Sequence, residues 1–195
     1  MMLSADFIEK KSDEELVLLT LKDQEYFTYL VRRYEDKLIR YILRISGLRK
    51  EDAEDLLQDI FIKVYQNLNG FDTSLKFSSW IYRITHNEVI SNHRKLKARP
   101  VGVSYDDDPI LINKLVSNTD FVKEIDRKYD AKVIQKVLAK MDEKYREVLI
   151  LRFLEEKDYN EMSDILQRPV GTVGAMVNRG KKQFKDIINK EKIEF

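Results

Sequence analysis

The chain has 195 residues, of which 43% are hydrophobic and 35% are charged, and its formal net charge is only +1. A chain of this length buries either one large core or two small ones, and its near-neutral balance means that any nucleic-acid-binding signal must be local. It contains no cysteine, which excludes disulfides and thiolate-bound zinc.

The same features favour a cytoplasmic protein. Residues 1–15 lack the apolar stretch of a secretory signal peptide. No apolar run approaches the roughly 18 residues that a membrane span needs. Proline and glycine are few, and the apolar residues recur near the helical period rather than alternating. We therefore expect no membrane insertion and an all-α fold built from two small helical domains.

In the first domain, residues 1–99, the pattern predicts three helices. The first covers residues 16–45 and is broken by Gly47. The second runs over residues 52–68, with an apolar stripe that includes Tyr65, and Asn69-Gly70 is expected to cap its end. After a loop over residues 71–75, the third helix continues until Pro100 stops it.

Residues 100–119 show no sustained period and are predicted to be an irregular linker to a second domain, residues 120–195. There, one helix is expected up to Met141 and another from Asp142. Asp158 and Glu161 have the spacing of a capping box, which predicts a short helix ending near Leu166. A turn and Pro169 then precede a last helix that runs to about residue 189.

The third predicted helix carries a basic face. Lys76, Arg83, Asn87 and Arg94 project within roughly 40° of one another at about 100° per residue. Aromatic and aliphatic residues lie on a neighbouring arc. Residues 76–99 hold six basic residues against one acid. In a near-neutral chain, this local concentration of positive charge indicates contact with phosphates.

The last two helices have the helix-turn-helix pattern. An ordinary amphipathic helix also has a charged outer face, but the capped short helix and the tight turn in front favour a DNA reader. Arg179 and Asn178 are the expected base readers, because Arg matches guanine and Asn matches adenine. The outward-facing positions are Thr172, Ala175, Asn178, Arg179 and Lys182.

Acidic residues crowd the start of the second helix, from Glu51 to Asp59. The helix dipole accounts for the first of them, at roughly 0.3–1 kcal/mol each. It does not account for Asp59, which lies two turns into the helix. From the residues alone, a solvated helix start and a docking surface for a basic protein partner remain equally open.

The motifs together resemble the extracytoplasmic-function group of bacterial sigma factors. The stretches DAEDLLQDIFIKVY at residues 52–65, FD at residues 71–72 and FxxWIYRIxxN at residues 77–87 resemble their region 2. The stretches DYNEMSDIL at residues 158–166, PVGTV at residues 169–173 and NRG at residues 178–180 resemble their region 4. The resemblance covers most of the chain, and the two sets of motifs occur in the family's order.

This resemblance implies a promoter-specificity subunit of RNA polymerase. Its expected partners are promoter DNA, the β′ clamp helices and β flap of core RNA polymerase, and an anti-sigma factor. Docking on the polymerase would involve Asp55, Gln58 and Asp59. Contact with the −10 promoter element would involve Phe71, Lys76, Ser78, Trp80, Arg83, Asn87 and Arg94. Contact with the −35 element would involve Thr172, Ala175, Asn178, Arg179 and Lys182.

Some positions depart from the family's pattern. Gly174 and Met176 stand where Lys or Arg is usual, Ala175 stands at a common Ser position, and Gln167 replaces a turn glycine. Two DNA contacts that the family usually makes at the −35 element are therefore missing from this chain.

Two other classes of function fit the sequence less well. A stand-alone helix-turn-helix regulator explains residues 158–189 but leaves the basic third helix and the acidic second helix without a role. An enzyme is disfavoured, because no nucleophile–base set or metal-spaced carboxylate pair is visible. His86 and His93 lack a third ligand for zinc. We expect no catalytic residue, metal, cofactor or small-molecule substrate.

Overall fold

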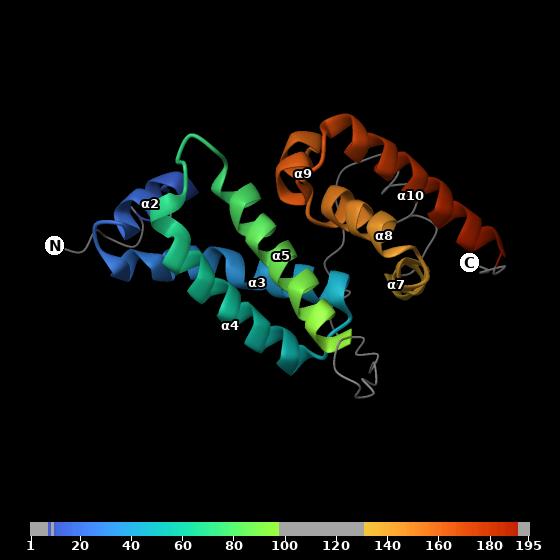
Figure 1. The fold of residues 1–195 in the computed structure, drawn as a ribbon, viewed down its shortest axis with the longest axis horizontal. Coiled ribbons are helices and arrows are strands. Elements are labelled where there is room, and N and C mark those ends of the chain that lie inside the picture. Colours follow the sequence, from blue (N-terminus) through green and yellow to red (C-terminus); the bar gives the residue numbers. More distant parts are fainter. Residues whose placement is uncertain (1–7, 9, 98–130, 191–195) are drawn as a thin grey trace. The chain divides into compact units, whose positions relative to one another are not determined.

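The computed structural model of the chain describes residues 8, 10–97 and 131–190. The chain divides between residues 103 and 104 into two compact units. Every element of the described residues is a helix, which confirms the predicted all-α class (Figure 1). The predicted linker, residues 100–119, and the start of the second domain lie outside the described residues, so the predicted domain boundaries stay predictions.

The prediction of one unbroken helix over residues 16–45 is wrong. Instead, α2 (Asp13–Thr20) is followed by a 3₁₀ turn, η1 (Gln24–Tyr26), and then by α3 (Phe27–Ser46). The reason is local capping: the Asp23 side chain accepts a hydrogen bond from the backbone N–H of Glu25 at 3.1 Å and starts a new helical turn. The apolar period continues across this break, so periodicity alone does not reveal it.

The other helix ends of the first unit are partly as predicted. α3 ends at Gly47, whose φ of 66° is the left-handed conformation that glycine adopts without strain. α4 (Lys50–Asn67), however, is not capped by Asn69-Gly70. It tightens into a second 3₁₀ turn, η2 (Leu68–Gly70), with Leu68 still in the right-handed region.

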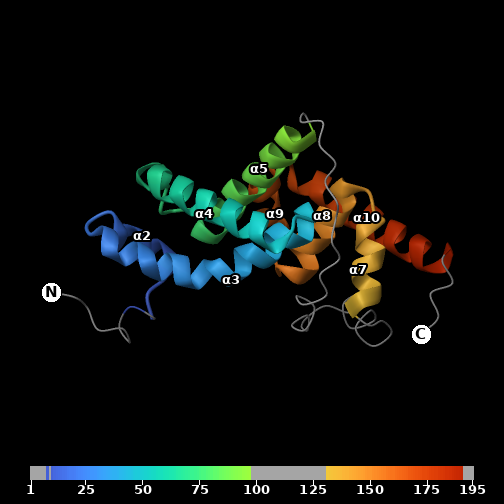
Figure 2. The same cartoon turned by 90° about the horizontal axis from the view of Figure 1, so that it is seen from below.

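The first unit is a bundle in which α3, α4 and α5 (Phe77–Lys97) pack on one another, and α2 lies against α3 and the start of α5 (Figures 1 and 2). Its centre is apolar and fully covered. The residues with no measurable exposure include Leu16, Leu30, Leu38, Ile42, Ile60, Val64, Phe77 and Ile81. The amphipathic period of the sequence therefore specifies which side of each helix is left for solvent.

The second unit contains α7 (Ala131–Ala139), α8 (Glu143–Leu149), a π-helical turn η4 (Ile150–Leu154), α9 (Tyr159–Leu166) and α10 (Val170–Lys190). α10 packs along α8 and also contacts α7 and α9. Asp158 and Glu161 form the predicted capping box, with bonds of 2.8 and 3.0 Å. The short helix, turn and long helix expected at the end of the chain are thus confirmed.

Candidate nucleic-acid interface

The basic face of α5 lies on the side of the helix away from the bundle core. Phe77, Ile81 and Val89 are buried in the core. Of the four polar residues predicted to share a face, Lys76, Asn87 and Arg94 are exposed and Arg83 is half-buried. Lys76, Asn87 and Arg94 are therefore accessible to a ligand, and Arg83 is accessible in part.

Three aromatic rings join the loop before α5 to the first turn of that helix. The ring centroid of Phe71 lies 5.5 Å from that of Phe77 and 5.1 Å from that of Trp80. The Phe77 and Trp80 centroids are 5.7 Å apart. Phe71 and Phe77 are buried, whereas Trp80 is half-buried. Of the predicted −10 residues, Trp80 thus keeps part of its ring open, and the ring of Phe71 is covered.

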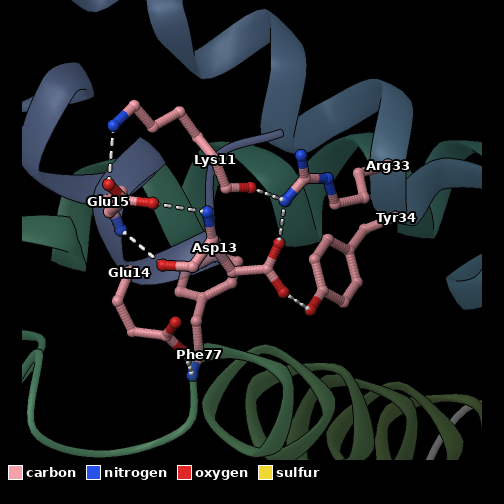
Figure 3. Close-up of polar contacts among 8 residues, drawn as sticks. Lys11, Asp13, Glu14, Glu15, Arg33, Tyr34 and Phe77 are labelled. Carbon is pink, nitrogen blue, oxygen red and sulfur yellow. Dashed lines mark hydrogen bonds and ion pairs between the residues drawn. The ribbon is translucent and has the colours of Figure 1, made fainter. Parts of the chain in front are cut away.

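The loop itself, residues 71–76, is an ordered turn. The Asp72 carboxylate accepts a hydrogen bond from the backbone N–H of Ser74 at 2.9 Å, and this bond lowers the pKa of Asp72. The backbone N–H of Leu75 bonds to the carbonyl of Asp72 at 3.0 Å. The loop ends where Glu14, on α2, accepts the N–H of Phe77 at 2.9 Å (Figure 3). Ser78, just inside the helix, is half-buried.

The outer face of α4 carries the predicted docking residues. Asp55, Gln58 and Asp59 are all exposed. Earlier on the same helix, Asp52 pairs with Arg49 at 2.9 Å and Glu54 with Lys50 at 3.7 Å. Within residues 10–97 and 131–190, Asp55 and Asp59 form no such pair. Within these residues, no ion pair therefore neutralises either carboxylate.

Two residues on this face were misjudged or missed by sequence reasoning. Tyr65 was assigned to the apolar stripe of α4, but it is 43% exposed, although one side of its ring packs against Phe27, with the centroids 5.1 Å apart. Ile62 is 56% exposed and follows Asp55 by seven residues, or about two turns. Its helical spacing from Asp55 and Asp59 could have shown, from the sequence alone, that Ile62 shares their exposed face.

In the second unit, α9, a turn and α10 form the helix-turn-helix. Gln167 takes the left-handed conformation, with φ 52° and ψ 47°, at the position where glycine is usual. Val173, Val177 and Phe184 are buried and hold α10 on the unit. The five predicted −35 residues, Thr172, Ala175, Asn178, Arg179 and Lys182, are all exposed.

Neighbouring positions on α10 are less open. Gly174 and Met176 are half-buried on the flanks of the exposed face. The Lys181 ammonium lies over the ring of Phe153, 5.1 Å from its centroid, so this lysine is engaged within the unit. Lys182, one residue later, extends into solvent.

Two properties of the described residues bear on other kinds of site. Among residues 10–97 and 131–190, no three His, Asp or Glu side chains gather where a metal ion could bind. No helix of the same residues combines the length and the apolarity that crossing a bilayer requires.

A helical bundle with an exposed basic helix, joined in one chain to a separate helix-turn-helix, defines a DNA-binding protein with two readers. The sequence matches two known families in that order: residues 30–99 match Sigma-70 region 2, and residues 131–184 match Sigma-70, region 4.

Curated relatives agree with these matches. The chain is 32% identical to the ECF RNA polymerase sigma factor SigW of Bacillus subtilis over 176 residues, which cover 85% of this chain and 92% of the relative. It is 30% identical to the ECF RNA polymerase sigma-E factor of Escherichia coli, covering 89% and 93%. The chain therefore belongs to the sigma-70 family, in its extracytoplasmic-function group, and is a promoter-specificity initiation factor.

Two solved structures share the fold. CnrH, solved in complex with the cytosolic domain of CnrY, has a TM-score of 0.67 at 20% identity, covering 92% of this chain and 99% of that one. The sigma factor RpoE of Bartonella quintana, solved with the anti-sigma factor NepR, has a TM-score of 0.67 at 21% identity, covering 84% and 96%.

Proposed function

We propose that the chain assigns each step of promoter recognition to one exposed helix face. The face of α4 around Asp55 and Asp59 docks on core RNA polymerase. α5 and loop 71–76 bind the −10 element, and α10 reads the −35 element. One observation supports this most directly: an acidic face, on which Asp55 and Asp59 form no ion pair with any other described residue, and two basic faces are exposed on three helices inside the segments that match sigma regions 2 and 4.

At the −10 element, the chemistry of α5 suits separated strands. Lys76, Arg83 and Arg94 supply positive charge along one side of the helix for a phosphate backbone. The open part of the Trp80 ring offers a surface on which an unpaired base stacks. Asn87 adds donor and acceptor groups for a base edge. Ser78 offers a hydroxyl, and Phe71 contributes by holding the loop in place.

At the −35 element, the exposed face of α10 suits the major groove of a duplex. Arg179 and Asn178 can each form a bidentate contact to a base edge, with guanine and adenine respectively. Lys182, one turn further along, is placed for a phosphate, which fixes the helix in the groove. Thr172 and Ala175 bring small side chains to the groove floor, where methyl groups meet the thymine methyl.

The docking face combines charge with apolar contact. Asp55, Gln58 and Asp59 complement a basic partner surface, and the exposed Ile62 beside them adds apolar area that water leaves on binding. The resemblance to region 2 supports the β′ clamp helices as this partner. By the same resemblance, the second unit meets the β flap.

We also propose that an anti-sigma factor binds this chain and covers its polymerase-binding faces. The support is that the two solved structures named above are complexes, that of CnrH with the cytosolic domain of CnrY and that of RpoE with NepR. The exposed Ile62 and Tyr65 on α4 fit a surface that different partners cover in turn.

The docking assignment is tested by reversing charge on α4. We expect Asp55→Arg and Asp59→Arg each to weaken binding to core RNA polymerase at least about tenfold, or about 1.4 kcal/mol, because each places a cation against a basic surface. Circular dichroism should be unchanged, since both side chains are exposed. The matched control is Asp36→Arg on α3, an exposed acid of another face, which should bind core normally.

Transcription in vitro with core polymerase and a genomic library tests the function as a whole. The wild-type chain should direct initiation from defined start sites. A chain that occupies duplex DNA tightly without polymerase, and directs no initiation with it, would instead be the stand-alone regulator. Normal core binding by both α4 variants would remove the docking assignment but not the −10 and −35 assignments.

A further inference from the structure

The helix that carries the −10 residues is capped by a side chain from a distant part of the sequence. α5 begins at Phe77, and the Lys76 carbonyl accepts hydrogen bonds from the N–H groups of Ser79 and Trp80. Lys76 thus stands at the N-cap, where Ser, Thr, Asp or Asn would accept a backbone N–H, and a lysine side chain has no acceptor. The N–H of Phe77 bonds instead to Oε1 of Glu14, 63 residues earlier, at 2.9 Å.

Asp13, the neighbour of Glu14 on α2, ties the same helical turn to α3. The Asp13 carboxylate accepts a hydrogen bond from Arg33 at 2.6 Å and another from the Tyr34 hydroxyl. Arg33 also donates to the Lys11 carbonyl at 3.0 Å. Figure 3 shows Asp13 turned toward α3 and Glu14 turned toward the start of α5. Two adjacent acids of one helical turn therefore connect α2 to both of its neighbours.

The same contacts reach the aromatic rings that hold loop 71–76. The Tyr34 ring packs edge-on against Phe77, with centroids 5.6 Å apart, and Phe77 in turn contacts Phe71 and Trp80. Leu16 and Val17 are fully buried and fix the rest of α2 in the bundle. The position of the loop, and of Trp80 and Lys76 beside it, thus depends on α2. Yet α2 lies outside residues 30–99, the segment that matches Sigma-70 region 2.

We propose that Glu14 is a positioning residue for −10 recognition: by capping α5 from α2, it fixes loop 71–76 and the first turn of α5 in the form that receives the separated non-template strand. The inference rests on the proposed −10 role of α5. A carboxylate at a helix N-terminus also interacts favourably with the helix dipole, so both its reach and its charge contribute. Glu14 itself does not touch the DNA.

Three substitutions separate reach from charge. Glu14→Gln keeps an acceptor oxygen at the same distance, Glu14→Asp keeps the charge and the acidic first turn of α2 but shortens the side chain by one methylene, and Glu14→Ala removes both. The control is Asp36→Ala, which removes an exposed carboxylate from another face. The probe is a fluorescent single strand covering the −10 non-template sequence of a promoter that the wild-type holoenzyme transcribes.

We expect holoenzymes with Glu14→Ala or Glu14→Asp to bind this strand about fivefold more weakly than wild type, the size of a lost helix cap. Permanganate reactivity of −10 thymines on the whole promoter should fall in parallel. Glu14→Gln should stay within about twofold of wild type, since a neutral acceptor retains most of a cap. Affinity for core polymerase and for a −35 duplex should stay unchanged in every variant.

The outcomes are distinct. Equal losses of core binding, −35 binding and −10 binding would show a purely structural cap and overturn the inference, as would normal −10 binding by Glu14→Asp. If Glu14→Ala does not fold, the Gln and Asp variants decide, because both keep a polar side chain on the first turn of α2. A wild-type holoenzyme that neither initiates transcription nor binds the strand would overturn the proposed function and this inference together.

Discussion

Tyr34 joins two parts of the first unit through one side chain. Its hydroxyl donates a hydrogen bond to Asp13 on α2, and its ring packs against Phe77 on α5. The residue is only 3% exposed. Burial, above all, and the hydrogen bond to the Asp13 carboxylate raise the pKa of Tyr34 far above its ordinary value of 10.0. The folded unit therefore keeps this phenol protonated under alkaline conditions in which the unfolded chain releases the proton.

This difference predicts an alkaline loss of stability. Because the pKa is raised in the folded state, the stabilisation is fully present below pH 10 and decreases as the pH rises above it, by at most about 1.4 kcal/mol per pH unit. We expect urea unfolding to show a steeper decline for wild type than for Tyr34→Phe between about pH 9.5 and 11. The single tryptophan, Trp80, lies in this unit, so its fluorescence reports this transition.

The comparison between the two proteins removes the contribution of other tyrosines and of lysines, which titrate in both. At neutral pH, Tyr34→Phe should be less stable than wild type, since Asp13 loses one of its two donors. Parallel pH profiles for the two proteins would mean that the unfolded chain also keeps Tyr34 close to an acid.

Single residues were predicted best where one helix decides their environment. The sequence correctly placed Asn178 and Arg179 on the open side of α10, because helical period alone separates them from Val177. It could not reveal the contact between Glu14 and Phe77, since a bond across 63 residues leaves no local pattern. Tyr65 was misplaced because a large ring at the edge of an apolar stripe can cover a neighbour and still remain 43% exposed.

At the scale of elements, α10 owes its position to a close approach to α8. A Cβ atom added at Gly180 would lie 3.2 Å from the carbonyl oxygen of Tyr145 and 3.2 Å from the Leu149 side chain. Gly174, a turn and a half earlier on the same helix, has nothing within 4 Å of such an atom. Glycine is therefore required for packing at the first position and has no packing reason at the second.

The two glycines predict opposite effects of one substitution. Gly174→Ala should stabilise the second unit by about 0.5–1 kcal/mol, because alanine favours the helix. Gly180→Ala gains the same helix propensity, but its methyl group pushes α10 away from the Tyr145 carbonyl of α8. This backbone atom cannot move aside as a flexible side chain can. We expect it to destabilise the unit by about 1 kcal/mol net, since overpacking costs about 1–3 kcal/mol. Thermal unfolding followed by circular dichroism measures both, and a gain at both positions would mean that α8 and α10 separate at little cost.

Element types were predictable from apolar period, but element ends depended on caps that compete locally. The capping box of Asp158 and Glu161 was visible in the sequence and is present in the fold. The break before α3 depends on a single local hydrogen bond between the Asp23 side chain and the Glu25 N–H. The end of α4 depends on whether a glycine takes the left-handed conformation. In both places, the apolar stripe continues and hides the change.

At the scale of the whole molecule, two proposed DNA-binding faces share one chain. The face proposed for the −10 element belongs to the first unit, and the face proposed for the −35 element belongs to the second unit of the same chain. Tethering makes the second binding event intramolecular, so the combined affinity exceeds either alone only when the spacing of the two DNA elements suits the bound protein. The separation of the two DNA elements that the holoenzyme accepts can therefore be measured by changing the promoter.

Inserting five base pairs between the two elements moves the −35 element by about 17 Å and rotates it by about half a turn. We expect initiation by wild type to fall at least about tenfold, because the bases of the −35 element then lie on the side of the DNA duplex away from α10. With Arg179→Ala, initiation from the unaltered promoter should fall by roughly 5- to 150-fold, which corresponds to about 1–3 kcal/mol. The insertion should then have a much smaller effect, because the variant has already lost part of its contact with the −35 element.

Run-off transcription from paired templates measures the effect of the insertion and the effect of Arg179→Ala. The control is a promoter with a scrambled −35 sequence, on which the insertion should not change initiation. The expected result requires Arg179 to contact a base and not only a phosphate. If Arg179→Ala lost activity equally on the scrambled and the intact promoters, its role would be non-specific attraction, and base reading at −35 would then fall to Asn178 and its smaller neighbours on the open face of α10.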